Sequence, residues 1–159
     1  SNGNGSLMRI LPLAFTEANP SDIEAISSIT HAHETSVEAC QVYVAIARRL
    51  LKGQQLSEIL SDLETSTTYA RLQTLAELTE ADIRSSGYVV DTLEAALWCL
   101  LTSTSYPETV LKAVNLGDDT DTVAAVAGGL AGIIYGLDEI PDNWLAQLRN
   151  KELLESCLF

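Results

Sequence analysis

The chain has 159 residues, 47% of them hydrophobic and 19% charged, which excludes a disordered segment and fits one domain with its own core. Its formal net charge of −13 excludes nucleic acid as a partner of the chain as a whole. The longest apolar stretch, residues 123–135, contains three glycines and is shorter than the roughly 20 residues that span a bilayer, so we expect a soluble protein with no membrane segment.

The cysteines and the first residues add two expectations. Cys40, Cys99 and Cys157 are odd in number and lack CxxC spacing, and the first two lie in helix-like apolar patterns. This usage favours free thiols in a reducing, cytoplasmic setting. The first methionine is Met8, so Ser1 is not an ordinary translation start and we expect a trimmed chain.

The N-terminal third reads as a loop followed by helices. Residues 1–9 are rich in glycine and asparagine, and Ile10–Phe15 is either a short helix or an irregular core segment. A short helix should follow through about residue 29, capped by Asn19 or Ser21. Apolar residues then recur at helical spacing over Glu34–Lys52, where Gly53 is the expected C-terminal cap.

The remaining elements are also expected to be helical. Asp91 is the expected N-cap of a buried helix, because Glu94 stands in capping-box position. Further helices are expected at residues 56–63 and, more weakly, 69–78, then from Pro107 to Leu116 before Gly117, from Asp121 to Tyr135, and after Pro141. No stretch alternates apolar and polar residues as a strand would, so we predict an all-α, compact multi-helix bundle forming a single domain over residues 1–159.

The most informative motif is Gly-Asp-Asp-Thr-Asp-Thr at residues 117–122, where a loop enters a helix. Three carboxylates this close repel one another, and a hard divalent cation such as Mg²⁺, Ca²⁺ or Mn²⁺ compensates that repulsion. Asp119, Asp121 and the Thr122 hydroxyl can converge on one point, which predicts a metal site. The alternative is that these residues only cap the helix and complement its dipole.

Two other readings of this motif fail on spacing. An EF-hand loop counted from Asp119 would need glutamate at its twelfth position, where the chain has Leu130. A phosphatase-type Asp-x-Asp-x-Val motif would need a preceding apolar strand and further acids and a lysine downstream. Here a helix precedes the motif and little chain follows it.

Two weaker candidates lie nearer the N-terminus. The loop around Gly3, Asn4 and Gly5 suits a phosphate or ribose contact because glycines expose backbone N–H groups, although such loops are usually plain turns. His31 and His33 are two residues apart and do not share a helix face, so a zinc site made from this pair is not expected. A core or capping role is the alternative for each histidine.

Several motifs together resemble the ADP-ribosylglycohydrolase family. They are GNGSLMR at residues 3–9, ITH at 29–31, SSGYVVDTLEAALW at 85–98, and AVNLGDDTDTVAAVAGGLAGIIYG at 113–136 followed by IPDNW. Their order and spacing fit over nearly the whole chain. The resemblance implies an all-helical fold, two bound Mg²⁺ or Mn²⁺ ions, and hydrolysis of the glycosidic bond that joins ADP-ribose to a protein side chain or a small acceptor.

The resemblance also implies roles for particular residues. Asp119, Asp121 and Thr122 would be metal ligands, and the metals would organise the ribose and an attacking water. The residues expected to contact ADP-ribose are Ser1, Asn2, Gly3, Asn4 and Gly5 around the diphosphate and distal ribose, His31 near the same ligand, and Ser86, Gly87 and Tyr88 along the cleft. Tyr88 would either stack on the ligand or pack against the protein.

Members of the family run to roughly twice this length, and the chain resembles their C-terminal half. The resemblance places a second set of metal ligands and the general acid or base in the absent N-terminal half, so no catalytic residue is assigned here. Our leading hypothesis is an ADP-ribosylglycohydrolase that works with this half as the same or a separate chain. The alternatives are a non-catalytic ADP-ribose or nucleotide binding module and a purely structural helical domain.

Overall fold

The structure is a computed structural model that describes residues 1–157. Every regular element in this part of the chain is helical, and the one β-bridge found there joins Gly3 to Tyr88. The α-helices are α1 (Pro20–Ser28), α2 (Glu34–Leu51), α3 (Leu56–Ser61), α4 (Val89–Leu101), α5 (Tyr106–Asn115), α6 (Thr120–Tyr135), α7 (Asp142–Ala146) and α8 (Lys151–Cys157). The 3₁₀ segments are η1 (Leu7–Arg9), η2 (Leu11–Phe15), η3 (Thr67–Glu77), η4 (Glu80–Asp82) and η5 (Leu137–Glu139). The predicted all-α class is therefore confirmed.

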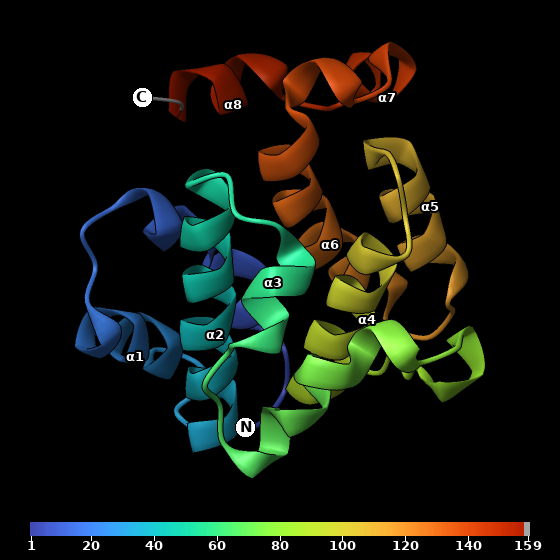
Figure 1. Ribbon diagram of the computed structural model, residues 1–159. Helices are drawn as coiled ribbons and strands as arrows, with labels where there is room; N and C mark the ends of the chain where they lie inside the picture. Colours follow the sequence, from blue (N-terminus) through green and yellow to red (C-terminus); the bar gives the residue numbers. More distant parts are fainter. Residues whose placement is uncertain (158–159) are drawn as a thin grey trace.

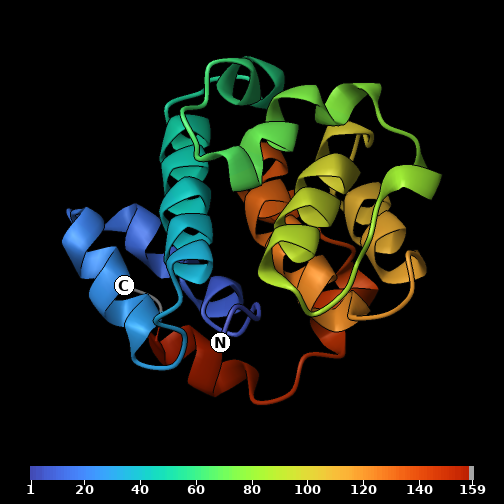
Figure 2. The same ribbon diagram turned by 90° about the horizontal axis from the view of Figure 1, so that it is seen from below.

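Helix α6 is the centre of the arrangement. It packs against α2, α4 and α5, and these helices lie side by side in both ribbon views (Figures 1 and 2). Helix α1 packs along α2, while α7 and α8 lie together at one end of the molecule (Figure 1). Because α6 packs against three helices, the loop-to-helix junction at residues 119–122 is attached to the core of the molecule.

Local sequence signals account for most helix ends. Asn19 caps α1, with its side-chain oxygen accepting from the N–H groups of Ser21 and Asp22. His33 caps α2 through Nδ1, which accepts from Thr35 N at 3.2 Å, so the capping alternative holds for this histidine. Gly53 follows α2 with a φ of +81°, the left-handed conformation expected of a terminating glycine.

The predicted start of α4 was wrong. The helix begins at Val89, two residues before Asp91, and Asp91 accepts a hydrogen bond from Ser86 Oγ at 2.6 Å instead of capping the helix. The N–H of Val89 donates to the carbonyl of Asn2 at 3.1 Å, so the start of the helix is set by pairing with the N-terminal loop. A contact 87 positions away in sequence cannot be read from a local capping pattern.

Other elements differ by small amounts from the expected ones. Helix α5 begins at Tyr106 because Ser105 Oγ accepts from Glu108 N at 3.3 Å, which leaves Pro107 in the second helical position. Helix α6 begins at Thr120. The weak helix expected at residues 69–78 is the 3₁₀ segment η3, and the segment after Ile10 is the 3₁₀ helix η2.

The glycines of α6 differ in what surrounds them. A Cβ at Gly129 would lie 2.6 Å from Leu11 Cδ2 and 2.9 Å from the hydroxyl of buried Tyr43, so this glycine lets η2 and α2 approach the helix closely. A Cβ at Gly132 would meet no described atom within 4 Å. Neighbouring segments therefore approach α6 closely at Gly129, while one side of α6 is open near Gly132.

Alanine substitutions at Gly129 and Gly132 should change the stability of the protein in opposite directions. Gly132→Ala should raise the free energy of unfolding by about 0.5–1 kcal/mol, because a helix-interior glycine carries an entropic cost and the added methyl group has room. Gly129→Ala should lower it, because Leu11 and Tyr43 must shift. Urea denaturation of both variants checks this, and a loss of stability in Gly132→Ala would contradict the open surface.

Buried Glu94 should make stability depend on pH. Its side chain forms an ion pair with Arg71 at 3.1 Å, and the residue is only 5% exposed. Burial raises the pKa of Glu94 above the ordinary value of 4.5. The positive charge of Arg71 opposes this shift, and the negative charge of Asp91 adds to it. A raised pKa means that the stabilisation linked to Glu94 is fully present below the unfolded pKa and is lost as pH rises through the folded pKa. As pH rises above the ordinary glutamate pKa of 4.5, the wild type should therefore lose stability relative to Glu94→Gln.

Glu108→Gln is a control for that comparison, because the pKa of Glu108 is shifted in the opposite direction to that of Glu94. Hydrogen bonds from the N–H and hydroxyl of Thr104 lower the pKa of exposed Glu108. Its stabilisation is therefore present above the unfolded pKa and is lost as pH falls through the folded pKa. Urea denaturation at pH values below and above 4.5 measures both variants, and parallel curves for wild type and Glu94→Gln would contradict the prediction.

The cysteines are not paired in the described part of the chain. Cys40 and Cys99 are buried. Burial raises the pKa of the Cys40 thiol above its ordinary value. It raises the pKa of Cys99 to about 12. Cys157, in α8, is exposed. The expectation of buried free thiols is confirmed for the first two cysteines.

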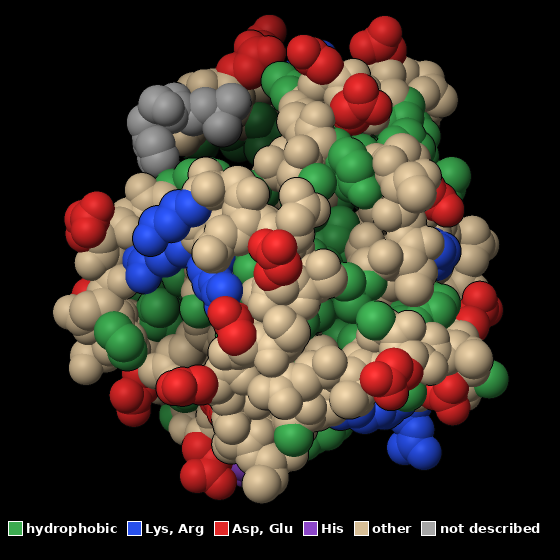
Figure 3. Space-filling model, in the orientation of Figure 1, with side chains coloured by type: hydrophobic (Ala, Val, Ile, Leu, Met, Phe, Trp, Pro, Cys, Tyr) green, Lys and Arg blue, Asp and Glu red, His purple; other side chains and the backbone are tan. Residues whose placement is uncertain are grey.

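The surface reflects the composition of the chain. Asp and Glu side chains are spread over the face seen in Figure 3, and Lys and Arg side chains appear in fewer places. Among residues 1–157, no helix is both long and apolar enough to cross a membrane.

Candidate functional site

Two of the three predicted site loops lie side by side. Gly3 and Tyr88 form the antiparallel bridge, and the N–H of Asn4 donates to the carbonyl of Gly87 at 3.2 Å. The N–H of Val89 donates to the carbonyl of Asn2 on the other side of the bridge. The loop formed by residues 1–5 is therefore held directly against the loop formed by residues 85–88.

The third loop, residues 117–119, joins them through Ser85 and Asn4. Asp119 N donates to the carbonyl of Ser85 at 3.0 Å, and Ser85 Oγ donates to the carbonyl of Gly117 at 2.7 Å. Asn4 Nδ2 donates to Asp119 Oδ2 at 2.5 Å. Three segments that are far apart in the sequence thus meet at the N-terminus of α6.

The turn before α6 directs the side chain of Asp119 toward the glycine loop, residues 1–5. Gly117 and Asp118 have consecutive positive φ values of +86° and +60°, which reverse the chain after α5. Glycine adopts this conformation freely, and aspartate is among the few other residues that tolerate it. Asp118 is exposed, whereas Asp119 is only half-buried and turns toward Asn4.

The side chain of Asp119 is not used to cap its helix. In the described chain, neither of its oxygens accepts from an N–H of α6; Oδ1 accepts from Thr122 Oγ1 at 3.1 Å and Oδ2 from Asn4. Asp121 Oδ1 accepts from Thr122 N at 2.9 Å, so a local backbone contact holds this second carboxylate. Simple capping therefore does not explain Asp119.

The chemistry of these groups suits a hard cation. Two carboxylates and a hydroxyl are oxygen donors of the kind that Mg²⁺ and Mn²⁺ prefer. Within residues 1–157, no three His, Cys, Asp or Glu side chains lie together as a metal site. Asp119, Asp121 and Thr122 can therefore supply some of the ligands of a divalent ion, and an octahedral Mg²⁺ would need more.

His31 lies against the glycine loop. A Cβ at Gly5 would lie 2.6 Å from His31 Cε1, and one at Gly3 would lie 3.6 Å from its Nε2. The other ring nitrogen, Nδ1, is 2.8 Å from Thr30 Oγ1, which also accepts from Arg9. A side chain at position 5 would collide with this ring, whereas a Cβ at position 3 would make only ordinary van der Waals contact with it. The structure therefore places His31 beside the predicted ligand loop.

The remaining predicted residues differ in whether their side chains are already hydrogen-bonded within the protein or are exposed to a ligand. Ser86 Oγ donates to Asp91 and accepts from Tyr88 N at 3.2 Å, so contacts within its own loop and α4 use this hydroxyl. Tyr88 is 39% exposed, so its side chain is available to a ligand. Ser1 and Asn2 are exposed, and the hydroxyl of Ser1 accepts from Gly3 N at 3.3 Å.

Sequence reasoning missed Ser36. Its side chain is fully buried near the start of α2, and its hydroxyl lies 3.2 Å from the carbonyl of Gly3 and 3.3 Å from that of Ser1, to one of which it donates. A serine among the buried positions of an amphipathic helix was the only available signal. Its hydrogen bond ties the glycine loop to α2.

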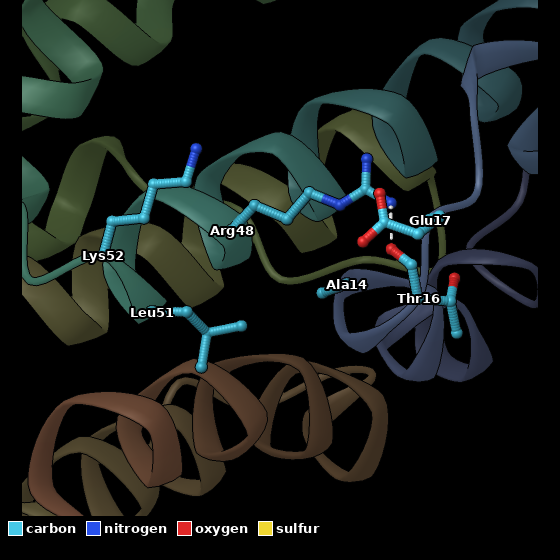
Figure 4. Close-up of a pocket in the computed structure, with 6 residues that line it drawn as sticks. All are labelled: Ala14, Thr16, Glu17, Arg48, Leu51 and Lys52. Atoms are coloured by element: carbon cyan, nitrogen blue, oxygen red, sulfur yellow. Dashed lines mark hydrogen bonds between the residues drawn. The ribbon is translucent and has the colours of Figure 1, made fainter.

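A separate pocket lies away from these loops. It has a volume of about 330 Å³ and is lined by Ala14, Thr16, Glu17, Arg48, Leu51 and Lys52 (Figure 4). The guanidinium of Arg48 donates to the backbone carbonyls of Leu13, Thr16 and Ala18 at 2.8–3.1 Å. These bonds hold the connection between η2 and α1, which gives Arg48 a structural role.

Comparison with known proteins identifies the family. The sequence matches the ADP-ribosylglycohydrolase family over residues 1–158. The chain belongs to this family. The resemblance inferred from the motifs is thus confirmed.

Individual family members show the same relationship. The chain is 37% identical over 155 residues to the ADP-ribosylarginine hydrolase Tri1 of Pseudomonas putida, covering 92% of this chain and 42% of that protein. It is 33% identical over 154 residues to the ADP-ribosyl-[dinitrogen reductase] glycohydrolase of Rhodospirillum rubrum, covering 94% of this chain and 51% of that protein. The chain therefore spans about half the length of the curated ADP-ribosylglycohydrolases it matches.

A solved structure shares the fold. The chain matches an ADP-ribosylglycohydrolase-related protein complex with a TM-score of 0.80 and 33% sequence identity, covering 98% of this chain and 58% of that chain. The helical arrangement described above is therefore shared with an ADP-ribosylglycohydrolase-related protein over nearly all of the present chain.

Proposed function

We propose that this chain carries one side of the active site of a Mg²⁺- or Mn²⁺-dependent hydrolase that cleaves the glycosidic bond between ADP-ribose and a protein side chain or small acceptor. The observation that carries the proposal is the position of Asp119. Its carboxylate is held by Asn4 and Thr122 where the predicted metal loop meets the two predicted ADP-ribose loops. The names of the ADP-ribosylarginine hydrolase and the dinitrogen reductase glycohydrolase support this substrate class.

Each group in the proposed site has a distinct task. Asp119, Asp121 and Thr122 would hold the ion through oxygen atoms, and the ion, when bound, would supply the positive charge that activates a water molecule. The glycine loop and His31 would bind the diphosphate and ribose. The exposed ring of Tyr88 offers a face on which a base or ribose can stack.

We propose that the remaining metal ligands and the general acid or base come from polypeptide outside this chain, as part of a longer chain or as a separate one. The open side of α6 supports this. Asp121 and Ala125 are exposed and Gly132 has free space, and these positions share one side of a helix that is apolar over most of its length. A second segment packed there would lie next to the candidate ligand Asp121.

An assay of the longest polypeptide that contains this segment tests the proposal. Purified protein is given ADP-ribosyl-arginine with Mg²⁺ or Mn²⁺, and released ADP-ribose is measured. We expect hydrolysis that stops when the metal is chelated. The absence of release with both metals would contradict the proposed activity.

A binding module that lacks the chemistry is the second candidate. It is favoured by one observation: this chain assembles the predicted ADP-ribose loops, whereas no general acid or base is assigned to it. This candidate predicts calorimetric binding of ADP-ribose to the longest polypeptide without turnover. We propose a cytoplasmic location for either function, in keeping with the buried, unpaired thiols of Cys40 and Cys99.

A further inference from the structure

Thr92 lies at the junction of the site loops although no site role was predicted for it. It is fully buried in the first turn of α4. Its hydroxyl oxygen accepts from Asn4 Nδ2 at 2.8 Å and lies 3.0 Å from the carbonyl of Ser86 and 3.2 Å from that of Tyr88. One side-chain atom thus contacts two of the three loops directly and reaches the third through Asn4.

The hydrogen-bond roles at this junction are determined by chemistry. A threonine hydroxyl has a single proton, and both carbonyls beside it are acceptors, so Thr92 donates to the backbone of the 86–88 loop. It must then accept from Asn4, which turns the NH₂ end of that amide toward Thr92. The same NH₂ group donates its second hydrogen to Asp119 Oδ2.

This arrangement fixes the orientation of the Asn4 amide. If the amide were reversed, its oxygen would face the Asp119 carboxylate, and two acceptors would be opposed at 2.5 Å. Asp119 is held on its other oxygen by Thr122. Both carboxylate oxygens therefore have defined donors, one of which depends on Thr92.

We propose that Thr92 is a positioning residue for the metal site, acting through Asn4 to set the orientation of the Asp119 carboxylate. The inference rests on the proposed function, because it assigns Asp119 the role of a metal ligand. Residues that orient metal ligands typically change metal affinity by about 10–100-fold when they are mutated. In residues 1–157, no hydrogen bond joins the Thr92 side chain to Asp119, Asp121 or Thr122, so its hydrogen-bonded path to Asp119 runs through the Asn4 amide.

The test compares three variants, made both in the 159-residue chain and in the longest polypeptide that contains it. Thr92→Val removes the hydroxyl at nearly constant volume, and Thr92→Ser keeps it. Thr109→Val is the matched control, because Thr109 is also fully buried and its hydroxyl donates to the carbonyl four residues earlier, that of Ser105, at 2.9 Å. Thr109 lies in α5 and has no hydrogen bond to Asn4 in the described chain.

The first measurement needs no metal. In NMR spectra of the metal-free chain, the side-chain amide protons of Asn4 should be shifted by their bonds to Asp119 and Thr92. The shift should be lost in Thr92→Val and retained in Thr92→Ser and Thr109→Val. If Thr92→Val does not fold, Thr92→Ala replaces it. An Asn4 amide unaffected by either variant would overturn the proposal.

The second measurement is Mn²⁺ binding by electron paramagnetic resonance, using the longest polypeptide that contains the chain. We expect the dissociation constant to rise about 10-fold or more in Thr92→Val, with Thr92→Ser and Thr109→Val close to wild type. Unchanged affinity in Thr92→Val would refute the positioning role. A wild-type protein that binds no Mn²⁺ would instead refute the proposed metal site, and the amide spectra distinguish these two failures.

Discussion

Replacing Asp119 by asparagine should lower the hydrolysis of ADP-ribosyl-arginine by on the order of 100-fold or more in the longest polypeptide that contains this chain. The substitution keeps the size of the side chain but removes the charge that would hold a divalent ion. It also puts an amide where Asn4 now donates to a carboxylate oxygen at 2.5 Å. Initial rates over a range of Mn²⁺ concentrations measure the effect.

Asp118→Asn is the matched control for that experiment. It removes the same charge one residue away, at an exposed position, and asparagine tolerates the φ of +60° found there. Its rate should stay close to that of the wild type. Equal losses in both variants would show that overall charge, and not a ligand at position 119, governs activity.

Leu130→Ala should give the largest loss of stability, about 2–5 kcal/mol. Leu130 is fully buried in α6, the helix that packs against α2, α4 and α5. Truncation removes its buried methyl groups and leaves a cavity that three surrounding helices cannot easily close. Urea denaturation followed by circular dichroism gives the change in the free energy of unfolding.

The same truncation at Leu137 provides the comparison. This residue follows α6 and is 68% exposed, so Leu137→Ala should change stability by no more than about 0.5 kcal/mol. Similar losses at the two positions would mean that α6 is not the centre of the core.

The helical elements could be predicted because their signals are local. Asn19 caps α1 through N–H groups two and three residues away, and Gly53 ends α2 within one turn of its last residue. The start of α4 could not be predicted in this way. Asp91 and Glu94 formed a plausible capping box, but the N-cap is Tyr88, three residues before Asp91, and the N–H of Val89 bonds to the carbonyl of Asn2.

The candidate site shows the same division. The clustered acids at residues 118–121 pointed to a cation because their chemistry and spacing are visible in the sequence, and the wider set of motifs pointed to the family that the comparisons confirm. The hydrogen bonds of these acids to residues far away in the chain could not be predicted from the sequence. In the sequence, Ser36 and Thr92 are ordinary polar residues of helices. In the structure, their hydroxyl groups form hydrogen bonds with the loop at residues 1–5.

The sequence by itself determined that the protein is all-helical, which oxygen-bearing residues lie where a loop enters α6, and which family they resemble. These properties depend on residue types within a few positions of one another. Only the tertiary structure decided that Asn4 bonds to Asp119, 115 positions away, and to Thr92, 88 positions away. Such contacts depend on how α2, α4 and α6 pack together, because packing sets the distance between residues that the chain itself leaves far apart.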